Sequence, residues 1–425
     1  MSDELPKGWA STRLEEIVTK KKGKKPAILR DTPAEGYVPY LDIHAIEKNV
    51  VREYAEVKSS KIASKDDLFV VWDGARSGWV GGGITGAIGS TIMALTAQTV
   101  ESAYVRQFIA SQFKNLNTNT RGTGIPHVDP EVFWNLEVPL APLAEQRRIV
   151  AKLEKLLGQV DACQQRLETM PTLLKRFRQS TLAAACSGRL TADWRDGDDG
   201  PDDLPRTWEL VEFGSLIAKG PNNGLYKPQS CYGSGTPIVR IDAFYDGKIS
   251  NWLELKRLQL SKQEREQFAL AEGDILINRV NSPKFLGKCA IVRAMPEPSV
   301  YESNMMRLQL DTARANSDYA ILYLRSSQGL EELRKNAKHA VNQSSINQDD
   351  VKFVMFALPP LAEQQEIVRR VAGLFALADQ LEQRLAQARQ QVDKLTPSLL
   401  ARAFAGKLVP QDPKDEPAEK LLNRK

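Results

Sequence analysis

The sequence predicts an α+β fold in which two β-rich domains are joined by two long helices that form an antiparallel coiled coil, with a pseudo-two-fold repeat. Three observations predict this fold class. A long segment occurs twice in the 425 residues, both copies carry apolar residues at heptad spacing, and the segments before them contain short β-branched and aromatic runs. We therefore expect the order domain, helix, domain, helix.

The internal repeat is clearest in the helices. A shift of 218 residues places residues 142–190 on residues 360–408 without a gap, and 18 of these 49 positions are identical. The start of each domain repeats as well, with Leu-Pro-Lys-Gly-Trp at residues 5–9 and Leu-Pro-Arg-Thr-Trp at residues 204–208. The resulting boundaries are a first domain at 1–141, a helix at 142–190, an acidic linker at 191–203, a second domain at 204–358, a helix at 359–408 and a flexible tail at 409–425.

Apolar residues in both helices alternate at spacings of four and three, which is the pattern of a coiled-coil seam. The pattern continues through Phe177 and Leu395. Because a domain separates the helices, they most simply pair antiparallel; the alternative is two amphipathic helices, each packed on its own domain. The predicted interhelix seam consists of Ile149, Leu153, Leu156, Val160, Leu167, Leu174, Ile367, Val371, Leu374, Leu381, Leu385 and Val392.

Prolines and glycines mark features within and after the helices. Pro171 and Pro397 fall inside the apolar pattern, where we expect kinks rather than helix ends. Gly188 and Gly406 follow the last turns and suit the left-handed residue that ends many helices. Strands are predicted at 37–46, 68–72, 89–96, 237–244, 274–279 and 289–293. The glycine-rich residues 81–86 read as a hairpin rather than a dinucleotide site, because strand-like residues follow them.

Composition and motifs exclude several classes of protein. No apolar run approaches the roughly 18 residues of a membrane span, and the N-terminus lacks the apolar core of a signal peptide. The four cysteines and three histidines show no disulfide or metal spacing, and no P-loop is present. A base-methylating enzyme would carry an Asn-Pro-Pro-aromatic tetrapeptide or similar, which is absent. We therefore expect a cytoplasmic protein with no metal, no bound cofactor and no active site of its own.

Polar segments suited to a polyanion recur at three equivalent places in each domain. They are residues 19–26, 72–78 and 121–127 in the first domain, and 219–227, 278–284 and 338–345 in the second. Lysines neutralise phosphates, whereas arginine and asparagine can contact guanine and adenine edges bidentately. The predicted DNA-contact residues are Lys20, Lys21, Lys22, Lys24, Lys25, Arg76, Ser77, Arg121, Thr123, His127, Asn223, Lys227, Arg240, Arg279, Asn281, Ser282, Lys284, Asn342, Gln343 and Ser344.

Several motifs occur twice in the same frame. Pro-Leu-Ala-Pro-Leu-Ala-Glu-Gln-Arg-Arg-Ile-Val stands at residues 139–150, and Leu-Pro-Pro-Leu-Ala-Glu-Gln-Gln-Glu-Ile-Val at 358–368. Leu-Leu-Lys-Arg-Phe-Arg-Gln-Ser at 173–180 and Ser-Gly-Arg-Leu-Thr at 187–191 accompany them. With these motifs, nearly the whole chain resembles the DNA-specificity subunit of type I restriction–modification enzymes.

The resemblance implies a sequence-recognition subunit without catalytic activity. Each β-rich domain would be a target-recognition domain that reads one half of a split target in double-stranded DNA. The helices would be a spacer and a dock for two modification (methyltransferase) subunits. S-adenosylmethionine would then be used by those subunits, and ATP and Mg by motor and nuclease restriction subunits. Two alternatives remain open: a self-sufficient fused methyltransferase–nuclease, and a coiled-coil scaffold whose two β-rich domains bind RNA or protein.

Overall fold

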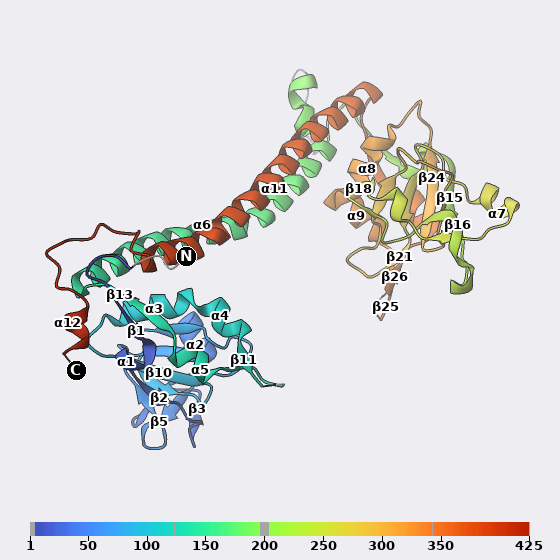
Figure 1. Cartoon of the computed structure of the whole chain (residues 1–425). Helices are drawn as coiled ribbons and strands as arrows, with labels where there is room; N and C mark the ends of the chain where they lie inside the picture. Colours follow the sequence, from blue (N-terminus) through green and yellow to red (C-terminus); the bar gives the residue numbers. More distant parts are fainter. Residues whose placement is uncertain (1–4, 123, 196–203, 342, 425) are drawn as a thin grey trace. The chain divides into compact units, whose positions relative to one another are not determined.

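The computed structural model of the chain describes residues 5–122, 124–195, 204–341 and 343–424. They divide into two compact units (Figure 1). Unit 1 comprises Met1–Glu168 and Ala386–Lys425, and unit 2 comprises Thr169–Leu385. Each unit therefore contains one β-rich domain and a part of both long helices, because the division cuts each helix.

The two predicted long helices are present. Helix α6 spans Leu143–Cys186 and helix α11 spans Leu361–Phe404. Each has 44 residues, which corresponds to a length of about 66 Å. Pro171 and Pro397 lie inside the helices rather than at their ends, as expected.

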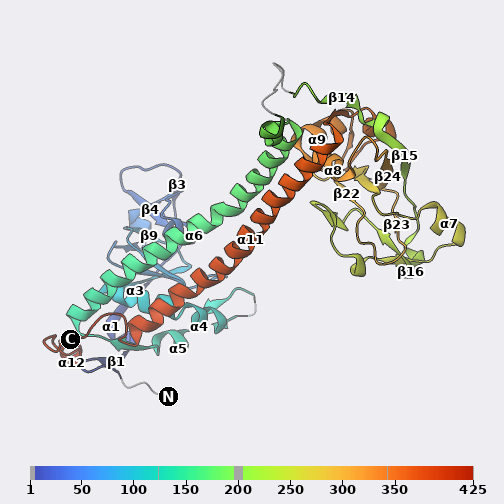
Figure 2. The same ribbon diagram turned by 90° about the horizontal axis from the view of Figure 1, so that it is seen from above.

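The helices pair antiparallel within each unit (Figure 2). In unit 1, Ile149 near the start of α6 shares a core with Leu400 near the end of α11. In unit 2, Leu182 near the end of α6 shares a core with Ile367 near the start of α11. The prediction of an antiparallel pair is confirmed.

The seam follows the predicted positions with one shift toward the end of each helix. In α6 the residue that follows Leu174 on the face toward α11 is half-buried Arg178, and in α11 the residue that follows Val392 is half-buried Thr396. Each step is four residues long, where the heptad predicts three. Phe177 and Leu395, which the pattern placed on the seam, are 37% and 44% exposed. A helix with 3.6 residues per turn drifts away from a 3.5-residue repeat, and a four-residue step corrects the drift. Leu381 is also exposed, whereas the other predicted seam residues are buried or half-buried.

Unit 1 contains two main sheets, in the orders β2-β10-β7-β8 and β3-β5-β4-β9-β6, and the pairs β1-β13 and β11-β12. The strands are β1 Ala10–Arg13, β2 Val18–Lys22, β3 Leu29–Arg30, β4 Tyr37–Leu41, β5 Tyr54–Glu56, β6 Ile62–Ala63, β7 Leu68–Val71, β8 Val80–Gly82, β9 Gly86–Ile88, β10 Ile92–Ala97, β11 Thr120–Arg121, β12 His127–Val128 and β13 Glu137–Leu140. Besides the parts of α6 and α11, the helices are α1 Leu14–Ile17, α2 Ile43–Lys48, α3 Ser102–Ser111, α4 Phe113–Thr118, α5 Pro130–Trp134 and α12 Glu419–Leu422.

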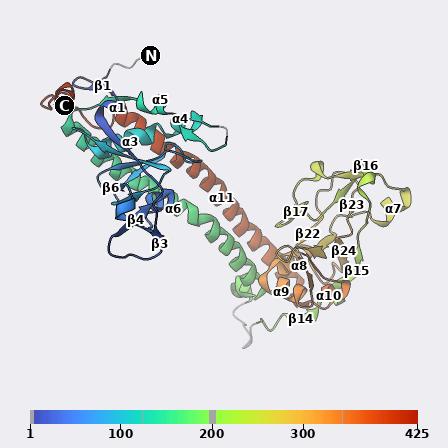
Figure 3. The same cartoon turned by 90° about the horizontal axis from the view of Figure 1, so that it is seen from below.

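Unit 2 is built around a six-stranded sheet, β15-β24-β20-β22-β18-β17, with smaller sheets β19-β16-β23, β21-β26-β25 and β14-β27. The strands are β14 Glu209–Glu212, β15 Ile217–Asn223, β16 Tyr232–Val239, β17 Phe244–Tyr245, β18 Gly247–Ile249, β19 Arg257–Leu258, β20 Ile275–Asn278, β21 Val280–Asn281, β22 Cys289–Ile291, β23 Val300–Tyr301, β24 Met305–Leu310, β25 Lys338–Ala340, β26 Gln343–Ser345 and β27 Met355–Leu358. The shorter helices are α7 Lys262–Gln267, α8 Ser317–Arg325, α9 Ser327–Arg334 and α10 Gln348–Lys352. Figure 3 shows α8, α9 and α10 together at the end of unit 2 where the long helices enter.

The central strand of each unit is buried on both faces. In β7, Leu68 and Val70 belong to one core and Phe69 and Val71 to another. In β20, Ile275 and Ile277 belong to one core and Leu276 to the other. Because successive side chains point to opposite faces of a sheet, strands buried on both sides read as the continuous apolar runs seen in the sequence.

Several predicted loops and strands differ from the structure. The lysine run is not a loop, because residues up to Lys22 form the edge strand β2, which pairs with β10. Residues 217–223 likewise form strand β15. The strand predicted at 37–46 ends at Leu41 and continues as helix α2, and the one predicted at 237–244 is divided between β16 and β17. Residues 81–86 are not a hairpin, since β8 and β9 belong to different sheets.

Each domain is joined to a long helix by the same contacts. The indole N–H of Trp9 donates to buried Glu145 at 3.1 Å, and that of Trp208 donates to buried Glu363 at 2.9 Å. Glu145 and Glu363 are equivalent residues of the repeat. Tryptophan N–H groups need an acceptor when they are buried, so the two Leu-Pro-x-x-Trp motifs dock on the two helix starts in the same way.

The glycines after the helices are left-handed, as predicted. Gly188 has φ +79° and Gly406 has φ +66°. A Cβ at Gly188 would lie 2.3 Å from the ring of Pro205, and one at Gly406 would lie 2.3 Å from the ring of Pro6. Glycine is therefore needed for two reasons at each position, namely its backbone conformation and the close approach of a Leu-Pro segment, that of the second domain at Gly188 and that of the first domain at Gly406.

The linker and the tail are more ordered than predicted. Residues 189–195 form a 3₁₀ turn, in which Thr191 is buried and Arg195 makes an ion pair with Glu363; residues 196–203 of the predicted linker lie outside the described residues. The tail packs on unit 1: Arg148 pairs with Asp415 at 2.6 Å and Leu421 of α12 is buried. The prediction of a flexible tail is wrong, because a few apolar side chains in a polar segment are enough to dock it.

Candidate nucleic-acid interface

In unit 1 the three predicted segments converge on Asp73. Lys22 Nζ on β2 lies 2.9 Å from Asp73 Oδ2, and His127 Nδ1 on β12 lies 2.8 Å from Asp73 Oδ1. Burial acts to raise the pKa of Asp73, but the hydrogen bonds from His127 and Lys22 outweigh it and leave the pKa below its usual value. The carboxylate is thus held ionised between two donors at the surface.

Two tryptophans lie beneath the lysines of β2. Lys20 Nζ is 4.6 Å from the ring centroid of Trp134, and Lys22 Nζ is 5.7 Å from that of Trp72. The two rings stack with centroids 5.9 Å apart. Cation–π contact of this kind favours ammonium groups held over an aromatic face, so the lysines form an ordered strip of positive charge.

The predicted arginines of unit 1 are exposed and ion-paired. Arg76 pairs with Glu47 at 3.0 Å, and Arg121 pairs with Asp129 at 2.6 Å and with Glu131 at 3.0 Å. The Arg76 and Arg121 side chains are 50% and 54% exposed, so their guanidinium groups are accessible to a phosphate or a base edge, whereas their partners Glu47 and Asp129 are each 17% exposed. Lys21 donates to the carbonyl of Ile62, whereas Lys24 and Lys25 are exposed.

Ser77 is not available for DNA, which corrects a prediction. Its side chain is buried, and its hydroxyl donates to the carbonyls of Gly74 and Pro126. A short hydroxyl in a turn can serve the backbone as well as a ligand, and here it ties the turn after β7 to the β11–β12 hairpin. Thr123, also predicted, lies outside the described residues.

Unit 2 repeats the pairing of a hairpin with the turn after the central strand. Strand β21, which follows β20, pairs with β26, and β26 pairs with β25. The register joins Val280 to Ser345, and in unit 1 an isolated bridge joins Asp73 to His127. In the repeat, Asp73 corresponds to Val280 and His127 corresponds to Ser345, so the two pairs are equivalent. The predicted segments 278–284 and 338–345 are therefore brought together, and Asn223 of β15 lies two strands from β20, opposite Met306 of β24.

The predicted side chains of unit 2 differ in their availability. Arg279 donates to the carbonyl of Ser303 at 3.2 Å, Arg240 lies 3.4 Å from Glu302, and Lys227 pairs with Glu264 at 2.6 Å. Ser344 is buried against His339 at 2.8 Å, so its assignment as a DNA contact is also corrected. Asn342 lies outside the described residues. The remaining predicted residues are exposed or half-buried, namely Asn223, Asn281, Ser282, Lys284 and Gln343.

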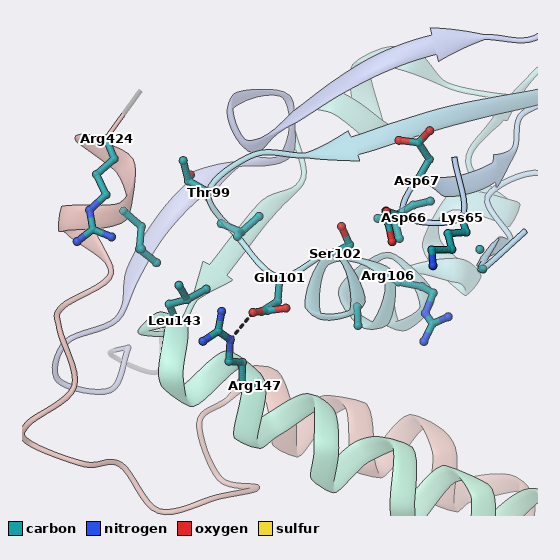
Figure 4. Close-up of a pocket in the computed structure, with 16 residues that line it drawn as sticks. Lys65, Asp66, Asp67, Thr99, Glu101, Ser102, Arg106, Leu143, Arg147 and Arg424 are labelled. Carbon is teal, nitrogen blue, oxygen red and sulfur yellow. Dashed lines mark hydrogen bonds and ion pairs between the residues drawn. The ribbon is translucent and has the colours of Figure 1, made fainter. Parts of the chain in front are cut away.

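A hollow of about 690 Å³ lies elsewhere in unit 1, where α3, α12 and the start of α6 meet (Figure 4). It is lined by basic and acidic side chains, and Arg147 bonds to Glu101 across it at 2.5 Å. As far as the structure describes the chain, its lining includes none of the predicted DNA-contact residues. The described residues also contain no group of His, Cys, Asp and Glu side chains able to hold a metal ion. None of the described helices is long and apolar enough to cross a membrane.

The family model described as "Type I restriction modification DNA specificity domain" matches the chain twice, at residues 6–170 and 205–389. The chain belongs to this DNA-specificity family. Its two family domains correspond to the two repeats, each a recognition domain followed by most of a long helix. The fold class and the family predicted from the sequence are therefore confirmed.

Relatives of this member of the DNA-specificity family are similar to it over nearly its whole length. The StySPI specificity subunit of Salmonella potsdam is 32% identical over 96% of this chain and 90% of its own, and the EcoKI specificity subunit of Escherichia coli K12 is 30% identical over the same shares. The crystal structure of the HsdS subunit from Thermoanaerobacter tengcongensis shares the fold, with a TM-score of 0.59 and 22% identity over 96% and 100% of the two chains. A chain from a study of complex assembly in the type I R-M system has a TM-score of 0.70 at 21% identity, over 95% and 99%.

The sequence analysis did not single out two residues, Asp73 and Lys288, whose contacts the structure defines. Asp73 stands inside a predicted segment, but its position between Lys22 and His127 becomes visible only once segments far apart in the sequence pair. Lys288 donates to the carbonyl of Ile241 at 2.8 Å and lies 4.0 Å from the ring of Tyr245 and 4.8 Å from that of Phe244. Burial lowers the pKa of Lys288. No local motif marks such a lysine.

Proposed function

We propose that this chain is the non-catalytic DNA-specificity subunit of a cytoplasmic type I restriction–modification complex, and that its two units read the two halves of a split target in double-stranded DNA. The observation that carries the proposal is the duplicated interface. In each unit a β-hairpin is joined to the turn after the central buried strand, through Asp73 and His127 or through Val280 and Ser345. Two copies of one backbone pairing, with different side chains on each, suit a target in two different parts.

The chemistry of the interface supports separate roles for its side chains. The lysines of β2 and the residues after it suit phosphates, which supply affinity without sequence information. Arg76 and Arg279 suit guanine edges in the major groove. Asp73 would repel phosphates, but an ionised carboxylate can accept a hydrogen bond from the amino group of cytosine, so its place between Lys22 and His127 suits a base contact.

The long helices suit a spacer and a dock for partner subunits. We assign to them two modification (methyltransferase) subunits, which would use S-adenosylmethionine, and motor and nuclease restriction subunits, which would use ATP and Mg. Leu173 and Phe177 of α6 and Leu377 of α11 are exposed apolar side chains within unit 2. Exposed apolar side chains on helices support a protein-binding face.

Mapping the methylated positions in the host genome, with and without the gene for this chain, tests the proposal directly. A two-part motif that disappears with the gene is the expected result. Footprinting of the full chain on that motif should then give two protected segments and an unprotected gap. Binding to RNA or protein without a footprint on duplex DNA would instead favour a scaffold. The chain alone should neither methylate nor cut DNA, and methyl transfer by the purified chain would refute its non-catalytic role.

A further inference from the structure

A β-hairpin extends from the body of each unit (Figure 1). The unit 1 hairpin is β11, β12 and the turn between them, and the unit 2 hairpin is β25, β26 and their turn. Each turn carries an aliphatic side chain directed to solvent: Ile125 is 62% exposed and Val341 is 93% exposed. The hairpins therefore present an apolar group at the tip of a polar surface.

The base of each hairpin is fixed to the central strand of its unit. In unit 1 the N–H of Gly74 donates to the carbonyl of Pro126 at 2.8 Å, and the N–H of Val128 donates to that of Trp72 at 2.9 Å. In unit 2 the N–H of Ile346 donates to the carbonyl of Arg279 at 2.9 Å. Buried Ser77 and Ser344, rejected above as DNA contacts, lie in these attachments. A fixed base gives the tip a defined position, as a reading element requires.

A single exposed aliphatic residue needs no explanation. Here each hairpin turn carries one, Ile125 or Val341, although the sequences of the turns and the positions within them differ. Gly-Thr-Gly-Ile-Pro precedes His127 in one, and Ala-Val-Asn-Gln precedes Ser344 in the other. His127 and Ser345 are equivalent by their bridges to Asp73 and Val280. Both hairpins thus present one exposed aliphatic side chain in the turn, although the two turns share no sequence.

The dimensions and chemistry of DNA suggest a role for such a tip in the major groove. The major groove, about 12 Å wide, admits a two-stranded β-ribbon, whereas a ribbon in the minor groove would insert its apolar side chain between base steps and kink the duplex. The apolar group displayed in the major groove is the C5-methyl of thymine. Arg121 and Lys338 lie on the hairpin strands, where a basic side chain can meet the groove's phosphates.

We infer that the two hairpins enter the major groove and that Ile125 and Val341 each recognise a thymine through its methyl group, one in each half of the target. The inference rests on the proposed function and adds specificity-determining residues to it. Burial of one methyl-sized group corresponds to about a four-fold change in affinity, which a titration can measure.

The test replaces thymines of the mapped target by deoxyuridine, one at a time, because deoxyuridine lacks only the methyl group. The full chain, with any subunits that copurify, is titrated against each duplex. One position in each half should weaken binding about four-fold. Ile125→Ala should abolish the sensitivity in one half and keep it in the other, and Val341→Ala should do the reverse. Leu210→Ala, at an exposed leucine of β14, should keep both.

The outcomes separate the inference from the proposed function. A parental chain that prefers no DNA sequence would refute the proposed function. Sequence-specific binding that tolerates deoxyuridine at every position would overturn the hairpin inference alone. Variants that lose affinity while both deoxyuridine effects persist would also overturn it, because their side chains would then act elsewhere than at the methyl groups.

Discussion

Glu363 accepts a hydrogen bond from the indole N–H of Trp208 at 2.9 Å and also faces the guanidinium of Arg195. Its equivalent in the repeat, Glu145, accepts from Trp9 at 3.1 Å and from the amide of Gln411 at 3.4 Å, both neutral donors. Burial raises the pKa of Glu145 above its usual value. The two junctions thus share one hydrogen bond but differ in electrostatics.

This difference predicts that replacing Glu363 by glutamine and replacing Glu145 by glutamine lower the free energy of unfolding by different amounts. Glu363→Gln breaks the buried ion pair with Arg195 and should lower the free energy of unfolding of unit 2 by about 3–5 kcal/mol. Glu145→Gln should change stability by less than about 1 kcal/mol, since neutral donors can be retained. Thermal unfolding of both variants, with exposed Glu168→Gln as control, would measure this. Equal losses would contradict the role given to Arg195.

The raised pKa of Glu145 predicts a pH effect. Because the folded-state pKa lies above the ordinary 4.5, the unfolded chain ionises first as the pH rises, and the parental chain loses stability relative to Glu145→Gln. The loss should begin near pH 4.5 and be complete above the folded-state pKa. Denaturant titrations of both proteins across this window would show it, and a pH-independent difference would contradict it.

The lysines of unit 1 should contribute unequally to the salt dependence of DNA binding. Each lysine that contacts a phosphate adds about 0.9 to the slope of log K against log salt. The double variant Lys24→Ala/Lys25→Ala should lower that slope by up to about 1.8 and weaken binding to all sequences. Lys22→Ala should change it less, because Asp73 already neutralises Lys22. Lys152→Ala, on the exposed side of α6, is the control.

The arginines should affect sequence preference rather than overall affinity. Arg76→Ala and Arg279→Ala should each relax specificity at a single position, in different half-sites, at a cost of about 1–3 kcal/mol. Competition with single-base variants of the target would detect this. A uniform loss across all sequences would identify these arginines as phosphate contacts instead.

If the helices are the spacer, their length should set the gap between half-sites. Arg389 of α11 donates to the carbonyl of Leu167 in α6. Because the helices are antiparallel, residues near Gln164 in α6 and Val392 in α11 lie side by side. Four-residue insertions at both places would add about 6 Å. The preferred gap should grow by one or two base pairs, because DNA rises about 3.4 Å per pair. Duplexes with stepped gaps provide the readout; a variant that keeps the parental gap would refute the spacer role.

The repeat made the architecture predictable. Heptad spacing, Gly188 and Gly406, and the recurring Leu-Pro-x-x-Trp start all depend on local sequence, and the structure confirms what they indicated. The four-residue steps at Arg178 and Thr396 were not predicted, because a strict heptad count ignores the drift of a straight helix.

The segments of the candidate interface could be identified from the sequence, but the contacts of their side chains could not. The three segments of unit 1 were identified by composition, yet the role of each side chain depends on pairing between residues far apart in sequence, such as Asp73 with His127. Ser77 and Ser344 were predicted to contact DNA because a hydroxyl in a turn can hydrogen-bond either to a ligand or to the backbone. Only the burial of the side chain distinguishes these two roles. The docked tail was missed because its polar composition outweighed Leu421.

The antiparallel pairing of the helices has a consequence for synthesis of the protein. Unit 1 is discontinuous, and Phe404 near the end of α11 packs on Tyr104 and Phe108 of α3, with ring centroids 5.2 and 5.3 Å away. At about 5–20 residues per second, the ribosome needs roughly 10–40 s to make unit 2, whose 217 residues separate the two segments of unit 1. During that time the first domain waits with part of its core uncovered, while unit 2, which is one continuous segment, can fold to completion. Although its domain emerges first, unit 1 should finish folding last, and pulse proteolysis of nascent chains would reveal that order.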